Sequence, residues 1–221
     1  MARPWKTCAT VPTRDGPLEL RQRADDDFLI LIAGRVLMTS KARRSEEVLA
    51  TLGCAALTDR RAPRVMIGGL GMGYTLRAAL DALPATATVT VVELTAEVEA
   101  WCRGPLAPLT SSAVSDPRVK VVIDDVARTI AAARPGAYDA ILLDLYEGAY
   151  PSNQRQPDPH FGHAALVRTR AALGPGGVVG VWAEEPDPVF PGRLEAAGFA
   201  VKTHRAGRGG RRHVVYLGRR S

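Results

Sequence analysis

The sequence predicts an α/β fold: a mostly parallel sheet that closes with an antiparallel hairpin, preceded by a small β unit. From residue 65 onward, short apolar runs alternate with segments of helical periodicity, a pattern typical of a parallel sheet covered on both faces. Two strand-like runs near the C-terminus, 199–204 and 213–217, are joined by a glycine–arginine turn. That turn is too short for a crossover helix, so the two runs must pair antiparallel. Residues 17–40 contain only short strand-like runs.

These observations divide the 221 residues into two parts. We expect a small N-terminal β-strand unit over residues 1–43 and a larger α/β domain with a seven-stranded sheet over residues 44–221. A parallel sheet that ends in an antiparallel hairpin is the architecture of Rossmann-like methyltransferases and not of dehydrogenases. The expected fold is therefore the Rossmann-like methyltransferase fold, with a small β unit before it.

The elements follow in order along the chain. In the N-terminal unit we expect strands at 18–23, 28–33 and 36–38. A helix follows over 45–57, because Ser45 can cap its N-terminus and Glu46 and Glu47 stand in its first turn. Before the hairpin, the larger domain has expected strands at 65–68, 88–93, 118–123, 139–144 and 177–182. Its expected helices are 73–83, 95–103, 126–133, 162–173 and 190–197.

A glycine-rich loop follows the first strand of the larger domain. Gly69, Gly71 and Gly73 form the pattern G-x-G-x-G, whereas a dinucleotide fingerprint would need a further glycine at Tyr74. The observed spacing is that of S-adenosylmethionine-binding transferases, which have no pyrophosphate to seat on the helix. The same glycines would also serve a tight strand-to-helix turn that binds nothing.

Acidic residues end the next two strands. Glu93 lies twenty residues after Gly73, where a carboxylate can accept hydrogen bonds from both ribose hydroxyls. Asp125 can accept a hydrogen bond from an adenine amino group, or it can cap the following helix, and the two roles are compatible. We expect the nucleoside site to be completed by Met72, Leu94, Asp124 and Val126.

The loop after the fourth strand carries the candidate catalytic residues. Asp144 and Glu147 could orient or deprotonate an amine nucleophile, with Tyr146 beside them. Tyr150 could shape the pocket for the acceptor, together with Gln154 and His160. A solvated loop with packing aromatic residues is the alternative reading of Glu147 and the tyrosines.

Composition narrows the classes of function. The net charge of +6 admits an anionic partner, but few aromatic residues stand among the arginines, so we do not expect nucleic-acid binding. Three separated cysteines and no His/Cys motif argue against a metal site, and we interpret Cys54 and Cys102 as core residues. The absence of a signal-like or membrane-spanning apolar stretch favours a cytoplasmic protein without a membrane segment.

Taken in order, the motifs resemble the spermidine synthase family over nearly the whole chain. They are LELRQRADDDFLILIAGRVLMTS, SEEVLA, the glycine loop with TLR, VVEL, VIDDVA, LLDLYEG and LGPGGVV. The resemblance implies a small β-domain before a Rossmann-like domain, a homodimer, and transfer of an aminopropyl group from decarboxylated S-adenosylmethionine to a polyamine. Relatives with the same fold are methyltransferases. Glu93, Asp125 and Asp144 match the family's ribose, adenine and catalytic acids.

Two departures from the family pattern favour methyl transfer. Where the family's loop GGGDGG has an aspartate for the donor's ammonium group, this chain has Met72, which leaves room for the carboxylate of intact S-adenosylmethionine. The family's DSSDP or DSTDP is DLYEG here, so Glu147 stands in place of the second acid. We therefore expect an S-adenosylmethionine-dependent methyltransferase acting on a small amine-bearing acceptor. The alternatives are a polyamine aminopropyltransferase and a non-catalytic nucleoside-binding protein.

Overall fold

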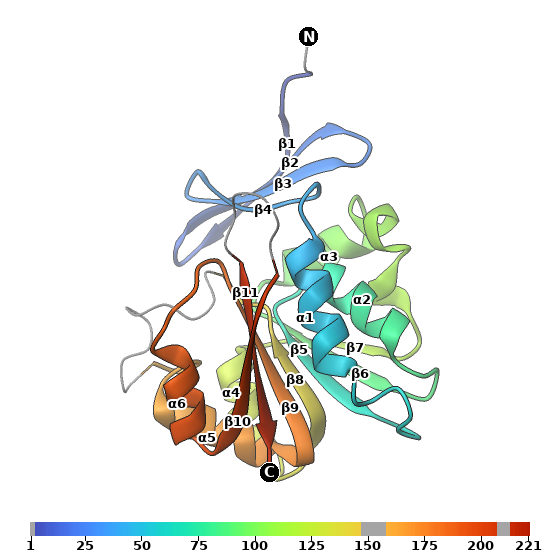
Figure 1. Ribbon diagram of the computed structural model, residues 1–221. Coiled ribbons are helices and arrows are strands. Elements are labelled where there is room, and N and C mark those ends of the chain that lie inside the picture. The colour runs from blue at the N-terminus through green and yellow to red at the C-terminus, as the bar shows by residue number, and fades with distance from the viewer. Residues whose placement is uncertain (1–2, 147–157, 207–212) are drawn as a thin grey trace.

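The computed structural model describes residues 3–146, 158–206 and 213–221. These residues form two β-sheets, one of which is covered by helices. Figure 1 shows the N-terminal sheet standing over one end of the larger α/β part of the chain. Within the described residues, no helix combines the length and the apolar character that crossing a bilayer requires.

The N-terminal sheet contains four antiparallel strands in the order β1-β2-β3-β4. They are β1 (Lys6–Thr13), β2 (Gly16–Ala24), β3 (Asp27–Ile32) and β4 (Arg35–Thr39). The sequence pattern did not predict β1. Its side chains are mostly exposed because it is an edge strand, so it lacks the apolar alternation that marks the buried strands.

The larger sheet has seven strands in the order β10-β11-β9-β8-β5-β6-β7. They are β5 (Arg64–Gly68), β6 (Thr88–Glu93), β7 (Val119–Ile123), β8 (Tyr138–Leu143), β9 (Leu173–Ala183), β10 (Phe199–Arg205) and β11 (Val214–Arg220). All pairs from β7 to β9 are parallel, and β11 runs antiparallel to both of its neighbours. The expected fold class, including the closing hairpin, is confirmed.

Helices cover both faces of this sheet. One face carries α1 (Arg44–Cys54), α2 (Tyr74–Ala82) and α3 (Ala96–Arg103), and the other carries α4 (Val126–Ala132), α5 (His163–Ala172) and α6 (Phe190–Ala196) (Figure 1). Along β8, Leu142 packs into one hydrophobic cluster and Leu143 into the other. Burying a leucine contributes roughly 2 kcal/mol, so a strand packed on both faces is a strong determinant of the fold.

Some local expectations were wrong. Ser45 does not cap α1: the cap position is Arg43, and the Ser45 side chain lies within the first turn. The helix ends at Cys54 rather than at residue 57, and β9 begins at Leu173, directly after α5. Short 3₁₀ helices at Ala107–Thr110 and Ala113–Ser115 were not foreseen. The burial of Cys54 and Cys102 is confirmed.

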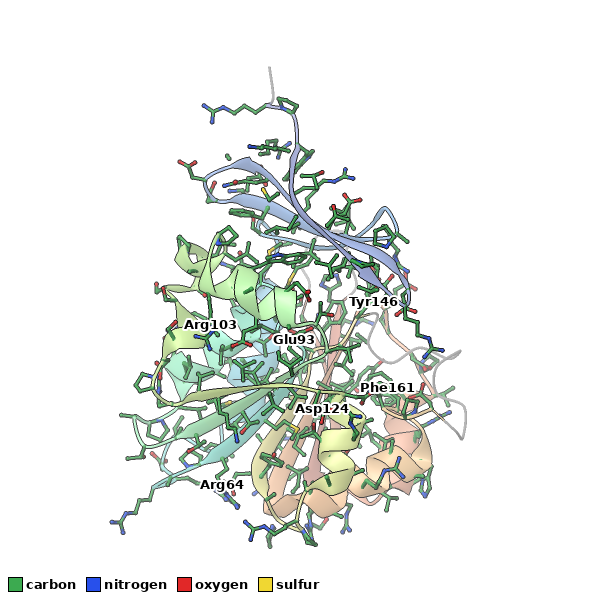
Figure 2. The ribbon with its side chains drawn as sticks, turned by 180° about the vertical axis from the view of Figure 1, so that it is seen from behind. Arg64, Glu93, Arg103, Asp124, Tyr146 and Phe161 are labelled. Atoms are coloured by element: carbon green, nitrogen blue, oxygen red, sulfur yellow. The ribbon has the colours of Figure 1, made fainter. Side chains whose placement is uncertain are left out.

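The strand order determines where a ligand can bind. From β5 the strands are added on one side as β6 and β7, and the chain then returns to add β8 and β9 on the other side of β5. In open α/β sheets the ligand crevice lies at the carboxyl ends of the strands at such a switch point. Glu93 and Asp124 lie toward that end, whereas Arg64 lies at the opposite end (Figure 2).

Candidate functional site

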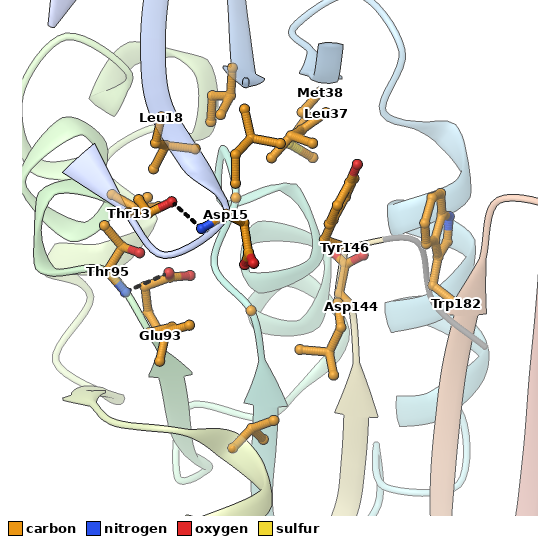
Figure 3. A pocket seen from close by; sticks show the side chains of 18 of the residues that line it. Thr13, Asp15, Leu18, Leu37, Met38, Glu93, Thr95, Asp144, Tyr146 and Trp182 are labelled. Carbon is orange, nitrogen blue, oxygen red and sulfur yellow. Dashed lines mark hydrogen bonds between the residues drawn. The ribbon is translucent and has the colours of Figure 1, made fainter. Parts of the chain in front are cut away.

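A cavity of about 560 Å³ lies between the N-terminal sheet and the carboxyl ends of the central strands. Its walls include Thr13–Asp15 from the β1–β2 turn and Arg35–Thr39 from β4. Figure 3 shows Glu93 and Thr95 on one side of this cavity and Trp182 on the other, with Asp144 and Tyr146 toward Trp182. We call the first the glycine-loop side (Gly69, Gly71, Glu93, Leu94, Asp124, Asp125 and Val126). We call the second the Asp144 side (Glu46, Asp144, Tyr146, Trp182 and His213).

The glycine loop leaves no room for side chains at two positions that line the cavity. At Gly69, φ is +87° and a Cβ would lie 2.3 Å from the carbonyl oxygen of Asp144. At Gly71, φ is +52° and a Cβ would lie 3.0 Å from the Sδ of Met38. Both positions therefore require glycine for their backbone conformation and for the close approach of neighbouring atoms.

Glu93 is held in place by backbone groups. One of its carboxylate oxygens accepts a hydrogen bond from the Leu70 N–H at 2.8 Å, and the other accepts one from the Thr95 N–H at 2.9 Å. Burial raises the pKa of Glu93, and these hydrogen bonds partly oppose that rise. Each oxygen keeps a further lone pair, so the carboxylate can still accept hydrogen bonds from a ligand's hydroxyls.

The acids at the end of β7 have different partners. Asp125 caps α4, because its Oδ1 accepts hydrogen bonds from the N–H groups of Ala127 at 2.7 Å and Arg128 at 3.2 Å. Asp124 forms an ion pair with Arg128, whose guanidinium lowers the pKa of that carboxyl. His160 Nε2 lies 3.8 Å from Asp125 Oδ1. The expected helix-capping role of Asp125 is thus confirmed, and its carboxylate also borders the cavity.

Asp144 follows β8 directly and is half-buried at the cavity wall. The Thr75 hydroxyl donates a hydrogen bond to its Oδ2 at 2.5 Å. Burial and the nearby Glu46 carboxylate raise the pKa of Asp144 to about 7, and the Thr75 hydrogen bond opposes this rise. A carboxyl group with that pKa can accept and release a proton near neutral pH.

Two segments far apart in the sequence meet beside Asp144. The buried Ser45 hydroxyl lies 2.7 Å from Glu46 Oε2 and 2.8 Å from His213 Nδ1. The His213 ring packs edge-on against Trp182, with 5.2 Å between ring centroids. The buried Nε1–H of Trp182 has no hydrogen-bond acceptor among the described residues.

Contacts also cross the mouth of the cavity. Arg35 of β4 forms an ion pair with Glu184 at 3.2 Å and lies over the Tyr146 ring, with 5.2 Å between the guanidinium carbon and the ring centroid. Arg35 therefore joins the N-terminal sheet to residues that follow β8 and β9. Exposed ion pairs of this kind contribute little stability, about 0–1 kcal/mol.

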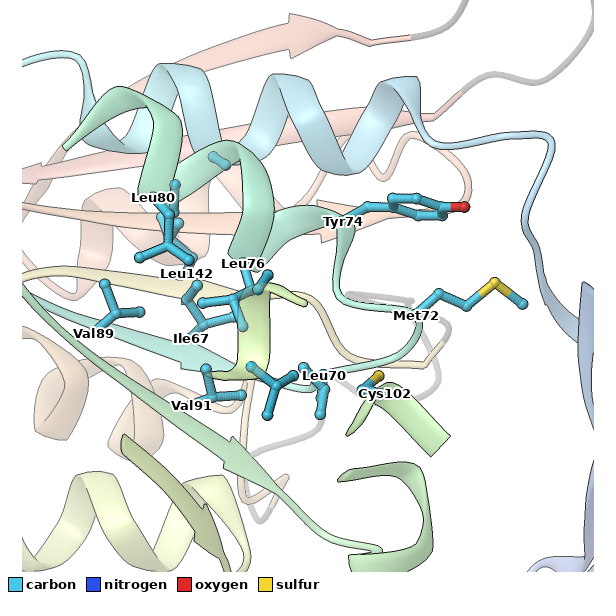
Figure 4. Close-up of a cluster of buried hydrophobic side chains, with 14 of the residues drawn as sticks. Ile67, Leu70, Met72, Tyr74, Leu76, Leu80, Val89, Val91, Cys102 and Leu142 are labelled. Carbon is cyan, nitrogen blue, oxygen red and sulfur yellow. The ribbon is translucent and has the colours of Figure 1, made fainter. Parts of the chain in front are cut away.

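Met72 and Gly73 differ from the expected arrangement. The Met72 side chain is fully buried and points away from the central sheet toward the N-terminal strands (Figure 4), and it does not line the cavity. Its backbone N–H faces the Met38 Sδ at 3.3 Å. The Gly73 N–H donates to the Leu70 carbonyl at 2.8 Å within the loop. The side chain of Met72 therefore does not provide the space that we expected for a donor carboxylate, and the Gly73 N–H is already bonded.

The structure brings most of the predicted site residues to one cavity. Those that line it are Gly69, Gly71, Glu93, Leu94, Asp124, Asp125, Val126, Asp144, Tyr146 and His160. Glu147, Tyr150 and Gln154 lie outside the described residues. Sequence reasoning missed Asp15, Glu46, Trp182 and His213 as cavity residues, and no local motif marks them. Among the described residues, no group of His, Cys, Asp and Glu side chains could hold a metal ion.

Comparisons with known proteins agree on one family. Residues 44–187 match the family described as the spermine/spermidine synthase domain, so the chain belongs to that family. It is 32% identical to a polyamine aminopropyltransferase of Mycobacterium tuberculosis, over 81% of this chain and 34% of that protein. It is also 36% identical to putrescine N-methyltransferase 3 of Nicotiana tabacum, over 55% of this chain and 30% of that protein. The chain thus spans about a third of the length of these curated relatives.

Solved structures support the fold. The spermidine synthase of Thermotoga maritima superposes with a TM-score of 0.74 at 18% identity, covering 98% of this chain and 73% of that one. A probable spermidine synthase of Corynebacterium glutamicum gives a TM-score of 0.65 at 21% identity, covering 96% of this chain and 79% of that one.

Proposed function

We propose that this protein transfers a methyl group from S-adenosylmethionine to an amine of a small cationic acceptor. The observation that carries the proposal is the presence, in one cavity, of a nucleoside-type site around Glu93 and a proton-accepting carboxyl at Asp144. Among the described residues that line the cavity, acids outnumber arginines although the whole chain is basic: Asp15, Glu46, Glu93, Asp124, Asp125, Asp144, Asp158 and Glu184 against Arg14 and Arg35. An acidic cavity favours positively charged ligands.

The residues present fit an adenosyl group. Glu93 would accept hydrogen bonds from the ribose, Asp124 or Asp125 would accept one from the adenine amino group, and Gly69 and Gly71 would allow close approach. The Met72 N–H donates to the Sδ of Met38, a weak acceptor that lines the cavity, so a donor carboxylate would take its place once the Met38 side chain moved aside. This backbone group supports intact S-adenosylmethionine as donor.

The chain's own residues perform the proton chemistry. When bound, the donor supplies an electrophilic carbon on a positively charged sulfur. Asp144 accepts a proton from the acceptor's ammonium group, so that the nitrogen lone pair is free to attack. Thr75 fixes the orientation of that carboxylate, and Trp182 offers aromatic surface for a cation, whereas the Tyr146 ring already carries the Arg35 guanidinium. The rest of the catalytic effect is positioning in a site from which water is excluded.

A second candidate is aminopropyl transfer from decarboxylated S-adenosylmethionine. Asp15, on the β1–β2 turn, lines the same cavity as Gly71 and could pair with the donor's ammonium group in place of the missing loop acid. The similarity to the mycobacterial aminopropyltransferase also favours it. Assembly as a homodimer remains a prediction.

One incubation distinguishes these functions. The purified protein is mixed with each donor and with a diamine such as putrescine, and the nucleoside product is identified by mass spectrometry. S-adenosylhomocysteine is the expected product, and methylthioadenosine would support aminopropyl transfer. If calorimetry shows that a donor binds but neither product forms with any of several amines, the protein is a nucleoside-binding protein and the proposal is wrong.

A further inference from the structure

If the proposed function holds, the reaction releases a proton into the cavity at each turnover, and the role assigned here to Ser45, Glu46 and His213 rests on that function. An ammonium acceptor and a sulfonium donor give an alkylated ammonium, a neutral thioether and one proton. The new N–C bond forms as the S–C bond breaks, and the S–C electron pair stays on sulfur. Asp144 takes up the proton, and it must lose that proton before the next turnover while the products still occupy the cavity that it faces.

A chain of three side chains begins next to Asp144. Ser45 and Glu46, adjacent on α1, are only 5% and 6% exposed. The Ser45 hydroxyl lies 2.7 Å from the Glu46 carboxylate and 2.8 Å from Nδ1 of His213, a residue 168 positions away in the sequence. Glu46 and His213 both line the cavity. The fold therefore brings an acid, a hydroxyl and an imidazole into one hydrogen-bonded row.

The hydroxyl between the acid and the imidazole can pass a proton in either direction. It carries a single hydrogen, so it donates to only one of its two neighbours at a time. When it donates to Glu46, the Nδ1 of His213 must carry a hydrogen and donate to Ser45. When Glu46 is protonated, it donates to Ser45, and Ser45 in turn donates to His213. The two arrangements differ by the transfer of one proton along the row.

Glu46 and His213, at the two ends of the row, lie where a proton could enter and leave it. Glu46 is close enough to Asp144 for its charge to affect that carboxyl, and both face the same cavity. His213 is half-buried and packs edge-on against Trp182, which holds its ring in place. We propose that Glu46, Ser45 and His213 form a proton relay that carries the proton away from Asp144 to the partly exposed imidazole of His213.

The relay is tested by following proton release and product formation together. A single turnover of the whole 221-residue chain is monitored in weak buffer with a pH-indicator dye, and quenched samples give the nucleoside product. In the wild type, proton release should keep pace with product formation. In Ser45→Ala, the product should form at the wild-type rate while proton release lags by about tenfold, and the steady-state kcat should fall and recover as imidazole is added.

Control variants separate a relay from a structural effect. Ser45→Thr keeps a hydroxyl and should restore prompt proton release, and Ser115→Ala, at an exposed serine outside the cavity, should change nothing. His213→Asn leaves α1 intact and should show the same lag as Ser45→Ala.

Three results would overturn the relay. They are prompt proton release in both Ser45→Ala and His213→Asn, a lag that persists in Ser45→Thr, and a lower kcat that imidazole does not restore. If the wild type forms product and the variants release protons promptly, only the relay is wrong. If the wild type forms no product from either donor, the proposed function fails and the relay fails with it.

Discussion

The two sides of the cavity are built in different ways. The glycine-loop side comes from consecutive units of the chain, β5 with its loop, β6 and β7, each of which contributes residues at its carboxyl end. The Asp144 side is assembled from α1, the end of β8, the end of β9 and the residue before β11. On the glycine-loop side, ligand contacts depend on backbone geometry. On the Asp144 side, they depend on side chains that meet only in the folded chain.

This difference leads to separable functions. The glycine-loop side should determine donor affinity, and the Asp144 side should determine the chemical step and its pH dependence. A substitution on the glycine-loop side should therefore change donor affinity but not the chemical step, and a substitution on the Asp144 side should do the reverse.

The largest expected effect is on catalysis by Asp144→Asn. Loss of the proton acceptor should lower kcat by about 10²- to 10⁴-fold, while the donor dissociation constant stays unchanged. Steady-state kinetics and calorimetry with S-adenosylmethionine measure the two quantities. Asp81→Asn, which changes an exposed carboxyl of α2, is the control. Equal losses of donor affinity and kcat would show that the two sides are not independent.

Glu93→Gln should show the opposite pattern. An amide offers only one acceptor oxygen where the carboxylate offers two, so the donor should bind about 10- to 100-fold more weakly, since a hydrogen bond to a charged group contributes roughly 1.5–3 kcal/mol. The kcat at saturating donor should change little. Glu97→Gln, on the exposed surface of α3, is the matched control. If donor affinity is unchanged in this variant, Glu93 does not bind the nucleoside.

The raised pKa of Asp144 also predicts a stability effect. The folded state binds a proton at this carboxyl up to pH about 7, whereas the unfolded chain loses it near pH 4. The folded protein therefore loses stability as pH rises between these values. Asp144→Asn should be more stable than the wild type by up to about 4 kcal/mol at pH 8 and nearly equal to it at pH 4. Thermal denaturation at both pH values checks this, and a gain independent of pH would contradict it.

The smallest effect concerns Glu46. Activity should rise with pH through a midpoint of about 7, because Asp144 must be ionised to accept a proton. Glu46→Gln removes a neighbouring negative charge, so the pKa of Asp144 should fall and the midpoint of kcat/KM should move to lower pH by roughly 0.5–1 unit. Glu47→Gln, at the next position of α1 and half-exposed, should leave the midpoint in place. A midpoint that moves upward or stays fixed would show that Glu46 does not act on Asp144.

Most of the fold follows from local patterns in the sequence. Apolar strands that are buried on both faces, such as β8, can be recognised in the sequence as continuous apolar runs. The short connection between β10 and β11 dictates their antiparallel pairing. Strand β1 could not be read in the same way, because an exposed edge strand needs few apolar residues.

The candidate site was predictable where its residues follow the carboxyl ends of parallel strands, as Asp125 and Asp144 do. Gly69, Gly71 and Glu93 belong to one continuous strand–loop–helix–strand unit, so their spacing carries the information. His213 meets Ser45 across 168 positions, and no spacing rule links them. The sequence around Ser45 and Glu46 indicates only the start of a helix, because serine and glutamate are common there for reasons unrelated to catalysis. Only the folded chain places Ser45 beside His213 and Glu46 at the cavity wall.

The most direct measurement is a crystal structure of the protein with S-adenosylhomocysteine. We expect the ribose hydroxyls within hydrogen-bond distance of the Glu93 carboxylate, and the ligand's own carboxylate on the Met72 N–H in place of the Met38 sulfur. A nucleoside bound away from Glu93, on the Asp144 side or outside the cavity, would contradict the assignment of the two sides.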